Sequence, residues 1–169
     1  MYSIILVILI LLFIPIFFLV APFAPTKKPE LVELDKIIKQ QKIKRFIDLG
    51  CGNGRVIYFL AKNNPEIYFS GIEYSFILYL ICKIRFWRQV NVRIYYGNLF
   101  SHDWSKYDAL YLFWMPRALE KYQDKFLKKI ISGQTVLSYV FPINFLQTNL
   151  TSQVRAGNRD LPIYCYHIE

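Results

Sequence analysis

The chain has 169 residues, and its 21 Lys and Arg outnumber its 12 Asp and Glu, so the formal net charge is +9. Residues 1–26 contain no Asp, Glu, Lys, Arg or His, and the remainder is long enough for one domain with a core but not for a second, substrate-binding domain. Cys51, Cys82 and Cys165 are odd in number and widely spaced, which excludes a disulfide framework or a CxxC metal knuckle and suits reduced thiols in a cytosolic setting.

Residues 1–22 are predicted to form a transmembrane anchor. The segment "YSIILVILILLFIPIFFLVA" is uncharged, and about 20 residues at roughly 1.5 Å each span the ~30 Å hydrocarbon layer. We favour an uncleaved anchor over a secretory signal, because no basic region precedes the segment and the prolines of "APFAP" follow it. Lys27 and Lys28 come next, so the positive-inside rule places the rest of the protein on the cytoplasmic or an equivalent side. We expect a linker over 23–29 and a domain over 30–169.

Within the domain, apolar patterns predict alternating strands and helices. Helices are expected over 30–41, 55–64, 74–89 and 117–132, with Pro29 at the start of the first and Gly133 at the end of the last. Strands are expected over 44–50, 66–73, 92–99, 108–114, 134–141 and 161–169. Such alternation is typical of an α/β fold whose doubly wound, mostly parallel sheet is covered on both faces.

The segment from Phe76 to Cys82 is apolar enough to suggest a second membrane span. Lys83 and Arg85 follow directly, however, and leave it far shorter than a span. We therefore interpret it as part of a core helix.

The stretch "DLGCGNG", residues 48–54, follows the first predicted strand, at the sheet edge where open α/β folds bind ligands. Its D-x-G-x-G-x-G spacing fits neither the dinucleotide fingerprint nor the Walker A loop. A carboxylate beside such a turn repels pyrophosphate and favours a ligand with an ammonium group. The alternative is a tight turn that binds no ligand.

Glu73 ends the next predicted strand, about 20 residues after the glycine turn. A carboxylate at that edge can accept hydrogen bonds from both hydroxyls of a ribose. An ammonium group near the first turn and a ribose near the second describe S-adenosylmethionine. Glu73 could instead cap the helix that follows it.

With these features the sequence resembles class I S-adenosylmethionine-dependent methyltransferases, which have a Rossmann-like fold. "DLGCGNGR", "GIEYS", "KIRFWRQ", "YYGNLF", "LYLFWMPRAL" and "LSYVFPI", behind an anchor, are similar in order and spacing to one group of them. This group comprises the small membrane-anchored protein lysine methyltransferases typified by the enzyme that modifies the c subunit of mitochondrial ATP synthase, with archaeal lysine methyltransferases as soluble relatives.

The resemblance implies roles for residues along the predicted sheet edge. The methionine end of the cofactor would contact the first loop, its ribose Glu73, and its adenine the turn at Asn98 and Leu99. The loop residues are Asp48, Gly50, Cys51, Gly52 and Gly54. Asn98 departs from the aspartate common in such enzymes, although its amide carbonyl can still accept from the adenine amino group.

The methyl acceptor is expected beside Trp114, Met115 and Pro116, which we interpret as a channel wall. "FWMP" lacks the Asn/Asp-Pro-Pro-aromatic motif of nucleobase amino methyltransferases, so nucleic acid is not the expected substrate. A lysine acceptor must lose its proton, and desolvation in an aromatic slot beside the sulfonium would lower its pKa. His102 and Asp103 are interpreted as a surface loop and not a metal site, because two histidines cannot make a typical zinc set.

These features predict a protein-lysine N-methyltransferase that binds the bilayer through its N-terminal helix and acts on a membrane or membrane-adjacent protein. A tether enriches such targets, and the positive charge favours an acidic partner, an anionic lipid surface or RNA. The alternatives are methylation of a lipid or quinone-like small molecule, and a non-catalytic interaction module that keeps the fold.

Overall fold

The computed structural model describes residues 26–157 and 161–169. The predicted anchor over 1–22 and the first residues of the linker lie outside this part of the chain. Within it, no helix has the length and apolar character needed to cross a bilayer.

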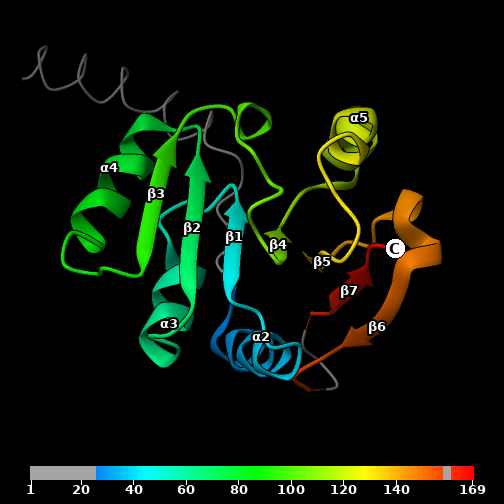
Figure 1. Ribbon diagram of the computed structural model, residues 1–169, viewed down its shortest axis with the longest axis horizontal. Coiled ribbons are helices and arrows are strands. Elements are labelled where there is room, and N and C mark those ends of the chain that lie inside the picture. Colours follow the sequence, from blue (N-terminus) through cyan, green and yellow to red (C-terminus); the bar gives the residue numbers. More distant parts are fainter. Residues whose placement is uncertain (1–25, 158–160) are drawn as a thin grey trace, which may run out of the picture.

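One seven-stranded sheet forms the centre of the molecule, in the order β3-β2-β1-β4-β5-β7-β6 (Figure 1). The strands are β1 (Arg45–Leu49), β2 (Tyr68–Glu73), β3 (Val92–Tyr96), β4 (Ala109–Leu112), β5 (Thr135–Tyr139), β6 (Leu150–Val154) and β7 (Ile163–His167). β1 to β5 pair in parallel, whereas β7 is antiparallel to both β5 and β6. The predicted doubly wound, mostly parallel sheet is confirmed.

Helices cover both faces of this sheet, as predicted. On one face, α2 (Lys28–Gln40), α3 (Arg55–Asn63) and α4 (Phe76–Arg85) contribute to one apolar core. On the other, α5 (Pro116–Leu127) packs with the segments around the 3-10 helices η1 (Leu99–Ser101) and η2 (Asn144–Asn149). α2 begins two residues earlier than expected and has Pro29 in its first turn, where a missing N–H costs nothing.

The prediction that the segment from Phe76 to Cys82 belongs to a core helix is wrong. The segment does form α4, but Cys82 is the one buried residue of that helix. α4 packs at the edge of the sheet beside β2 and β3, as Figure 1 shows, so only one side of it meets the core. Its apolar composition indicated burial but could not say how many neighbours the fold would supply.

Two other elements differ from the sequence prediction. The helix expected over 117–132 ends at Leu127, because the residues after it form turns that lead into β5. β6 was missed, since the sequence "LTSQV" is mostly exposed and polar, as suits an edge strand.

Candidate functional site

The glycine turn connects β1 to α3 at the carboxyl edge of the sheet. Gly50 and Gly52 have φ values of 101° and 56°, which side-chain-bearing residues rarely adopt. The turn is tied to β2, because the Gly50 and Cys51 N–H groups both donate to the Ile72 carbonyl at 3.0 Å. The predicted loop therefore holds its backbone in a fixed shape against the neighbouring strand.

Gly54 allows close packing between the loop and the end of α4. A Cβ at this position would lie 2.6 Å from Cε2 of Phe86 and 3.0 Å from Sγ of Cys82. The Cys82 thiol in turn donates to the Gly52 carbonyl at 3.1 Å. The third glycine of the motif thus lets α4 approach the loop closely.

Asp48 is a buried carboxyl at the end of β1, with 4% of its surface exposed. Burial, followed by the charge of Glu73, raises the pKa of Asp48 from 3.8 to about 8. A cation bound beside it would offset both causes, since an opposite charge favours the ionised carboxylate. The two carboxyl groups therefore favour the binding of a positively charged ligand.

Glu73 links the glycine turn to the start of α4. Its Oε2 accepts from the Gly52 N–H at 2.8 Å, and its Oε1 accepts from the Ser75 N–H at 2.7 Å. Each carboxylate oxygen has two lone pairs, so one remains on each for a ribose hydroxyl. Glu73 thus organises the backbone just before α4 without bonding the N–H groups of the helix itself, and it keeps the acceptors that ribose binding requires.

Asn98 and Leu99 lie at the end of β3, beside Glu73, because the Gly97 N–H donates to the Glu73 carbonyl at 3.0 Å. The Asn98 Oδ1 accepts from the Phe100 N–H at 3.0 Å and caps η1. Aspartate and asparagine cap helices equally well, so the departure from aspartate leaves this local structure intact. The adenine role of the two residues stays a prediction.

Of the three predicted acceptor residues, only Trp114 reaches the glycine loop. Its indole N–H donates to the Leu49 carbonyl at 2.8 Å, and a Cβ on Gly50 would lie 3.9 Å from that nitrogen. Met115 directly precedes α5, Pro116 is the first residue of that helix, and both are exposed. The structure therefore places Trp114 against the glycine loop and the other two at the start of α5.

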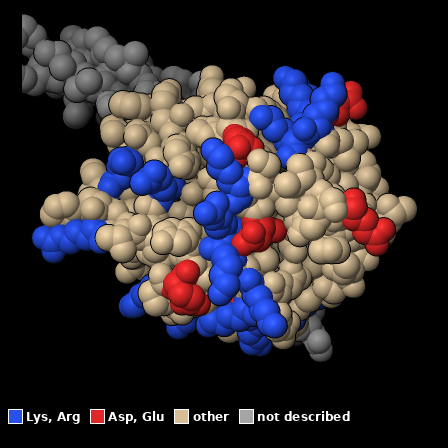
Figure 2. Space-filling view, viewed as in Figure 1, with Lys and Arg blue, Asp and Glu red and all other residues tan. Residues whose placement is uncertain are grey.

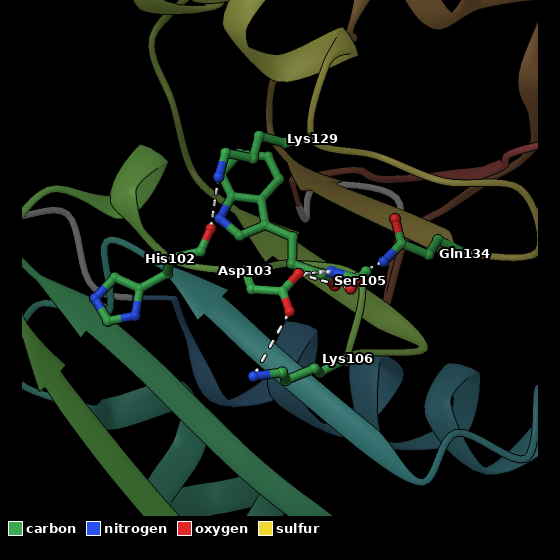
Figure 3. Close-up of polar contacts among 7 residues, drawn as sticks. His102, Asp103, Ser105, Lys106, Lys129 and Gln134 are labelled. Atoms are coloured by element: carbon green, nitrogen blue, oxygen red, sulfur yellow. Dashed lines mark hydrogen bonds and ion pairs between the residues drawn. The ribbon is translucent and has the colours of Figure 1, made fainter.

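His102 and Asp103 belong to a loop that is stabilised by hydrogen bonds and an ion pair (Figure 3). The Asp103 carboxylate accepts from the N–H and hydroxyl of Ser105 and pairs with Lys106 at 3.6 Å. The Lys129 ammonium donates to the His102 carbonyl at 2.9 Å. Partial burial, and then the charge of Lys129, lower the pKa of His102. Among the described residues, no three His, Cys, Asp or Glu side chains gather as metal ligands.

A buried polar pair that the sequence analysis missed lies between α2 and β5. The Tyr139 hydroxyl donates a hydrogen bond to Oε1 of Glu30 at 3.3 Å, and Glu30 is fully buried. Within the described part of the chain, the other carboxylate oxygen of Glu30 has no hydrogen-bond partner. One signal was available, because Glu30 stands four residues before the buried Leu34 and thus on the apolar face of its helix.

An aromatic wall leads to this pair from the ends of β4 and β5. The Phe113 ring contacts Tyr139 edge-on, with centroids 5.1 Å apart, and stacks on Phe141 at 6.1 Å with an interplanar angle of 6°. Phe113 and Phe141 are half-buried. Val140, between Tyr139 and Phe141 in the sequence, has a φ of 73°, which is a strained conformation for a β-branched residue. Part of the surface of the Phe113 and Phe141 rings remains accessible to solvent, beyond the ends of β4 and β5.

The site as a whole fits S-adenosylmethionine. Gly50 and Gly52 form a left-handed backbone turn at the sheet edge, the buried Asp48 favours a cation, and Glu73 keeps a free acceptor site on each oxygen. These carboxyl groups and acceptors suit a ligand with an ammonium, a sulfonium and a ribose. When bound, that cofactor supplies an electrophilic methyl group.

Comparison with known proteins agrees with this chemistry. The ANTKMT methyltransferase domain matches residues 48–149. A protein-lysine N-methyltransferase from Saccharolobus islandicus (strain REY15A) is 28% identical over 151 residues, which cover 87% of this chain and 93% of that protein.

Solved structures show the same fold. An RNA methyltransferase from Salinibacter ruber in complex with S-adenosyl-L-homocysteine superposes with a TM-score of 0.71 at 22% identity, covering 86% of this chain and 94% of that one. The O-methyltransferase of Bacillus cereus, also in complex with S-adenosyl-L-homocysteine, superposes with a TM-score of 0.66 at 11% identity, covering 88% of this chain and 84% of that one. The matched domain, the fold and the site geometry agree. The chain belongs to the ANTKMT methyltransferase family and is an S-adenosylmethionine-dependent methyltransferase.

Proposed function

We propose that the protein is a protein-lysine N-methyltransferase that acts on a membrane-embedded or membrane-adjacent protein. The observation that carries the lysine assignment is the buried Glu30 carboxylate at the end of the Phe113 and Phe141 wall, joined to it by Tyr139. The relative from Saccharolobus islandicus bears the same activity in its name and supports the same acceptor.

The wall and the carboxylate suit the chemistry of a lysine side chain. Its methylene stem packs on aromatic rings, and its ammonium is attracted to their faces and to a nearby carboxylate. An ammonium cannot attack the sulfonium methyl, because it has no lone pair. Desolvation against the aromatic wall and the charge of the sulfonium both lower the lysine pKa, and the oxygens of Tyr139 and Glu30 can hold the departing proton.

Tyr139→Phe and Glu30→Gln test the acceptor assignment. Both keep the shape of the site, so cofactor affinity should stay near that of the wild type. We expect the rate of methyl transfer to lysine to fall at least about tenfold in each variant, with a changed pH profile, because the proton acceptor is altered. Calorimetry would follow cofactor binding, and labelled methyl transfer would follow the rate. An unchanged rate in both variants would rule out the proposed role of this pair.

The acceptor class is tested with the full chain in detergent, supplied with methyl-labelled cofactor and, separately, membrane proteins, a lipid extract and RNA. We expect the label on lysine residues of membrane proteins. Label confined to the lipid extract would favour the small-molecule alternative, and label in RNA would contradict the argument from "FWMP". A Gly52→Val variant is the negative control, because valine is strained at a φ of 56° and obstructs the loop.

A further inference from the structure

α4 presents an apolar stripe to solvent. Phe76, Ile77, Leu80, Ile81 and Ile84, here called the α4 face, are between 40% and 74% exposed. They recur at the three- and four-residue spacing that places side chains on one side of a helix. A contiguous apolar surface of this kind marks an interaction site in a soluble domain.

Cations border this stripe. At 3.6 residues per turn, Lys83 and Arg85 fall on opposite edges of the α4 face, while Cys82 points to the core. Trp87, in the turn that follows, is 73% exposed, and the Arg88 guanidinium lies 4.3 Å from its ring centroid. An apolar stripe between cations, with a tryptophan at its end, is the pattern of a helix that lies in a membrane interface.

The charge around α4 is of one sign. No Asp or Glu occurs between Glu73 and Asp103, whereas that stretch contains Lys83, Arg85, Arg88 and Arg93. Figure 2 shows tan and blue atoms over the edge of the molecule where α4 lies, at the left. The surface is thus complementary to an anionic partner.

A basic hollow of about 550 Å³ adjoins the end of α4. Its lining includes the cations Lys28, Arg55 and Arg85 and no carboxylate residue. Lys28 begins α2, so the chain enters the described domain beside the end of α4. The uncharged segment over residues 1–22, long enough to span a bilayer, precedes that entry point by a few residues.

We infer that the α4 face and its bordering cations lie against the surface of an anionic lipid bilayer, with lipid phosphate groups at the basic hollow. The apolar side chains enter the boundary between headgroups and acyl chains, and the cations meet the lipid phosphates. This contact turns the adjoining end of the sheet, and with it the methyltransferase site, toward the plane of the membrane. The inference extends the proposed membrane-adjacent activity, but its test needs no methyl transfer.

Charge complementarity selects the bilayer over other occupants. A second copy docked on the same face would bring two apolar stripes with basic borders together, and the like charges of those borders repel. Residues 1–25 contain no carboxylate with which these cations could pair. An anionic membrane matches both the apolar stripe and its basic borders.

A nitroxide label on Ile84→Cys, in the full chain reconstituted into vesicles of phosphatidylcholine and phosphatidylglycerol, tests the contact. Power-saturation spectroscopy compares collisions with oxygen, which partitions into lipid, and with a water-soluble nickel chelate. We expect the oxygen-to-nickel accessibility ratio to be several-fold higher at Ile84→Cys than at Leu127→Cys on α5. Leu127 is 41% exposed and serves as the matched control. The native cysteines are buried, so labelling of the unsubstituted chain gives the background.

Two results would overturn the inference. Equal, water-like ratios at the two positions would mean that α4 does not touch the bilayer. Shielding of the Ile84→Cys label from both probes, in detergent as in vesicles, would mean that protein covers the face. Size-exclusion chromatography with light scattering would then separate a second copy from residues 1–25.

A charge variant gives a second, independent measure. In Lys83→Gln/Arg85→Gln, we expect the ratio at Ile84→Cys to fall toward the water-exposed control in anionic vesicles, because the attraction to lipid phosphates is reduced. Lys125→Gln/Lys128→Gln, at the end of α5 and just after it, should leave this ratio unchanged. A double α4 variant that keeps the full ratio would contradict the role of charge. Cofactor binding by each variant verifies that the fold is intact, and loss of methyl transfer with this contact retained would refute only the proposed function.

Discussion

α3 and α4 are neighbours in sequence and in space, yet the fold uses them in opposite ways. α3 buries Val56, Ile57, Leu60 and Ala61, whereas α4, with a more apolar sequence, buries Cys82 alone. α3 packs against both β2 and α2. α4 lies at the sheet edge beside β3, where no further helix of the described chain covers its outer side (Figure 1).

The difference shows that apolar content and burial are separate quantities. The fold determines how much of a helix is covered, and apolar surface left uncovered points to a partner outside the domain. On the sheet face that α3 covers, even a carboxyl group is buried: Asp48, which lies just before the glycine turn. Substitutions around α3 and substitutions in α4 should therefore have different effects, and three experiments sharpen the comparison.

The largest effect is expected for Asp48→Asn, in the dependence of stability on pH. The folded-state pKa of about 8 lies above the ordinary 3.8, so between these values the folded protein holds a proton that the unfolded chain has lost. The free energy of unfolding should therefore fall as pH rises from about 4 to about 8, by on the order of several kcal/mol. Asparagine cannot titrate, so the variant should lack this decrease.

Urea unfolding of the cofactor-free protein at a series of pH values measures the effect. The variant should gain stability relative to the wild type as pH rises, and the difference should level off above about pH 8. Parallel curves for the two proteins would instead show that the pKa of Asp48 stays near 3.8 in the folded protein.

The next effect contrasts one leucine on each helix. Leu60→Ala in α3 removes a fully buried side chain and should lower the free energy of unfolding by about 2–5 kcal/mol. Leu80→Ala in α4 removes a side chain that is 42% exposed, and its cost should be under about 1 kcal/mol. Denaturant titration in detergent measures both. Equal costs would mean that the α4 face is covered in the isolated protein.

The smallest effect concerns the junction between the loop and α4. In Gly54→Ala the new Cβ would lie 2.6 Å from a Phe86 ring carbon, at a φ of 74°, so we expect a cost of about 1–3 kcal/mol and weaker cofactor binding. Gly133→Ala is the matched control, because its φ is 84° but nothing lies within 4 Å of the new Cβ. If the two variants lose the same stability, only backbone strain acts at Gly54 and the close packing of α4 does not matter.

Sequence by itself determined the features that depend on neighbouring residues. The alternation of strands and helices predicted the parallel sheet, and "DLGCGNG" followed by Glu73 predicted two carboxylates at one sheet edge. Both features follow from local chemistry. Glycines permit the left-handed turn, and the acids stand where consecutive parallel strands end. The cofactor assignment depended on this pattern and is confirmed.

Only the tertiary structure decided which distant residues meet. Glu30 and Tyr139 are 109 residues apart, and they form a pair because α2 packs on the sheet face to which β5 contributes. Likewise, Gly54 contacts Phe86 only because α4 folds back on the loop. The exposure of α4 has the same origin, since its edge position follows from the strand order and not from its own sequence. A local pattern specifies an element and its apolar stripe, whereas its neighbours depend on how every other element packs.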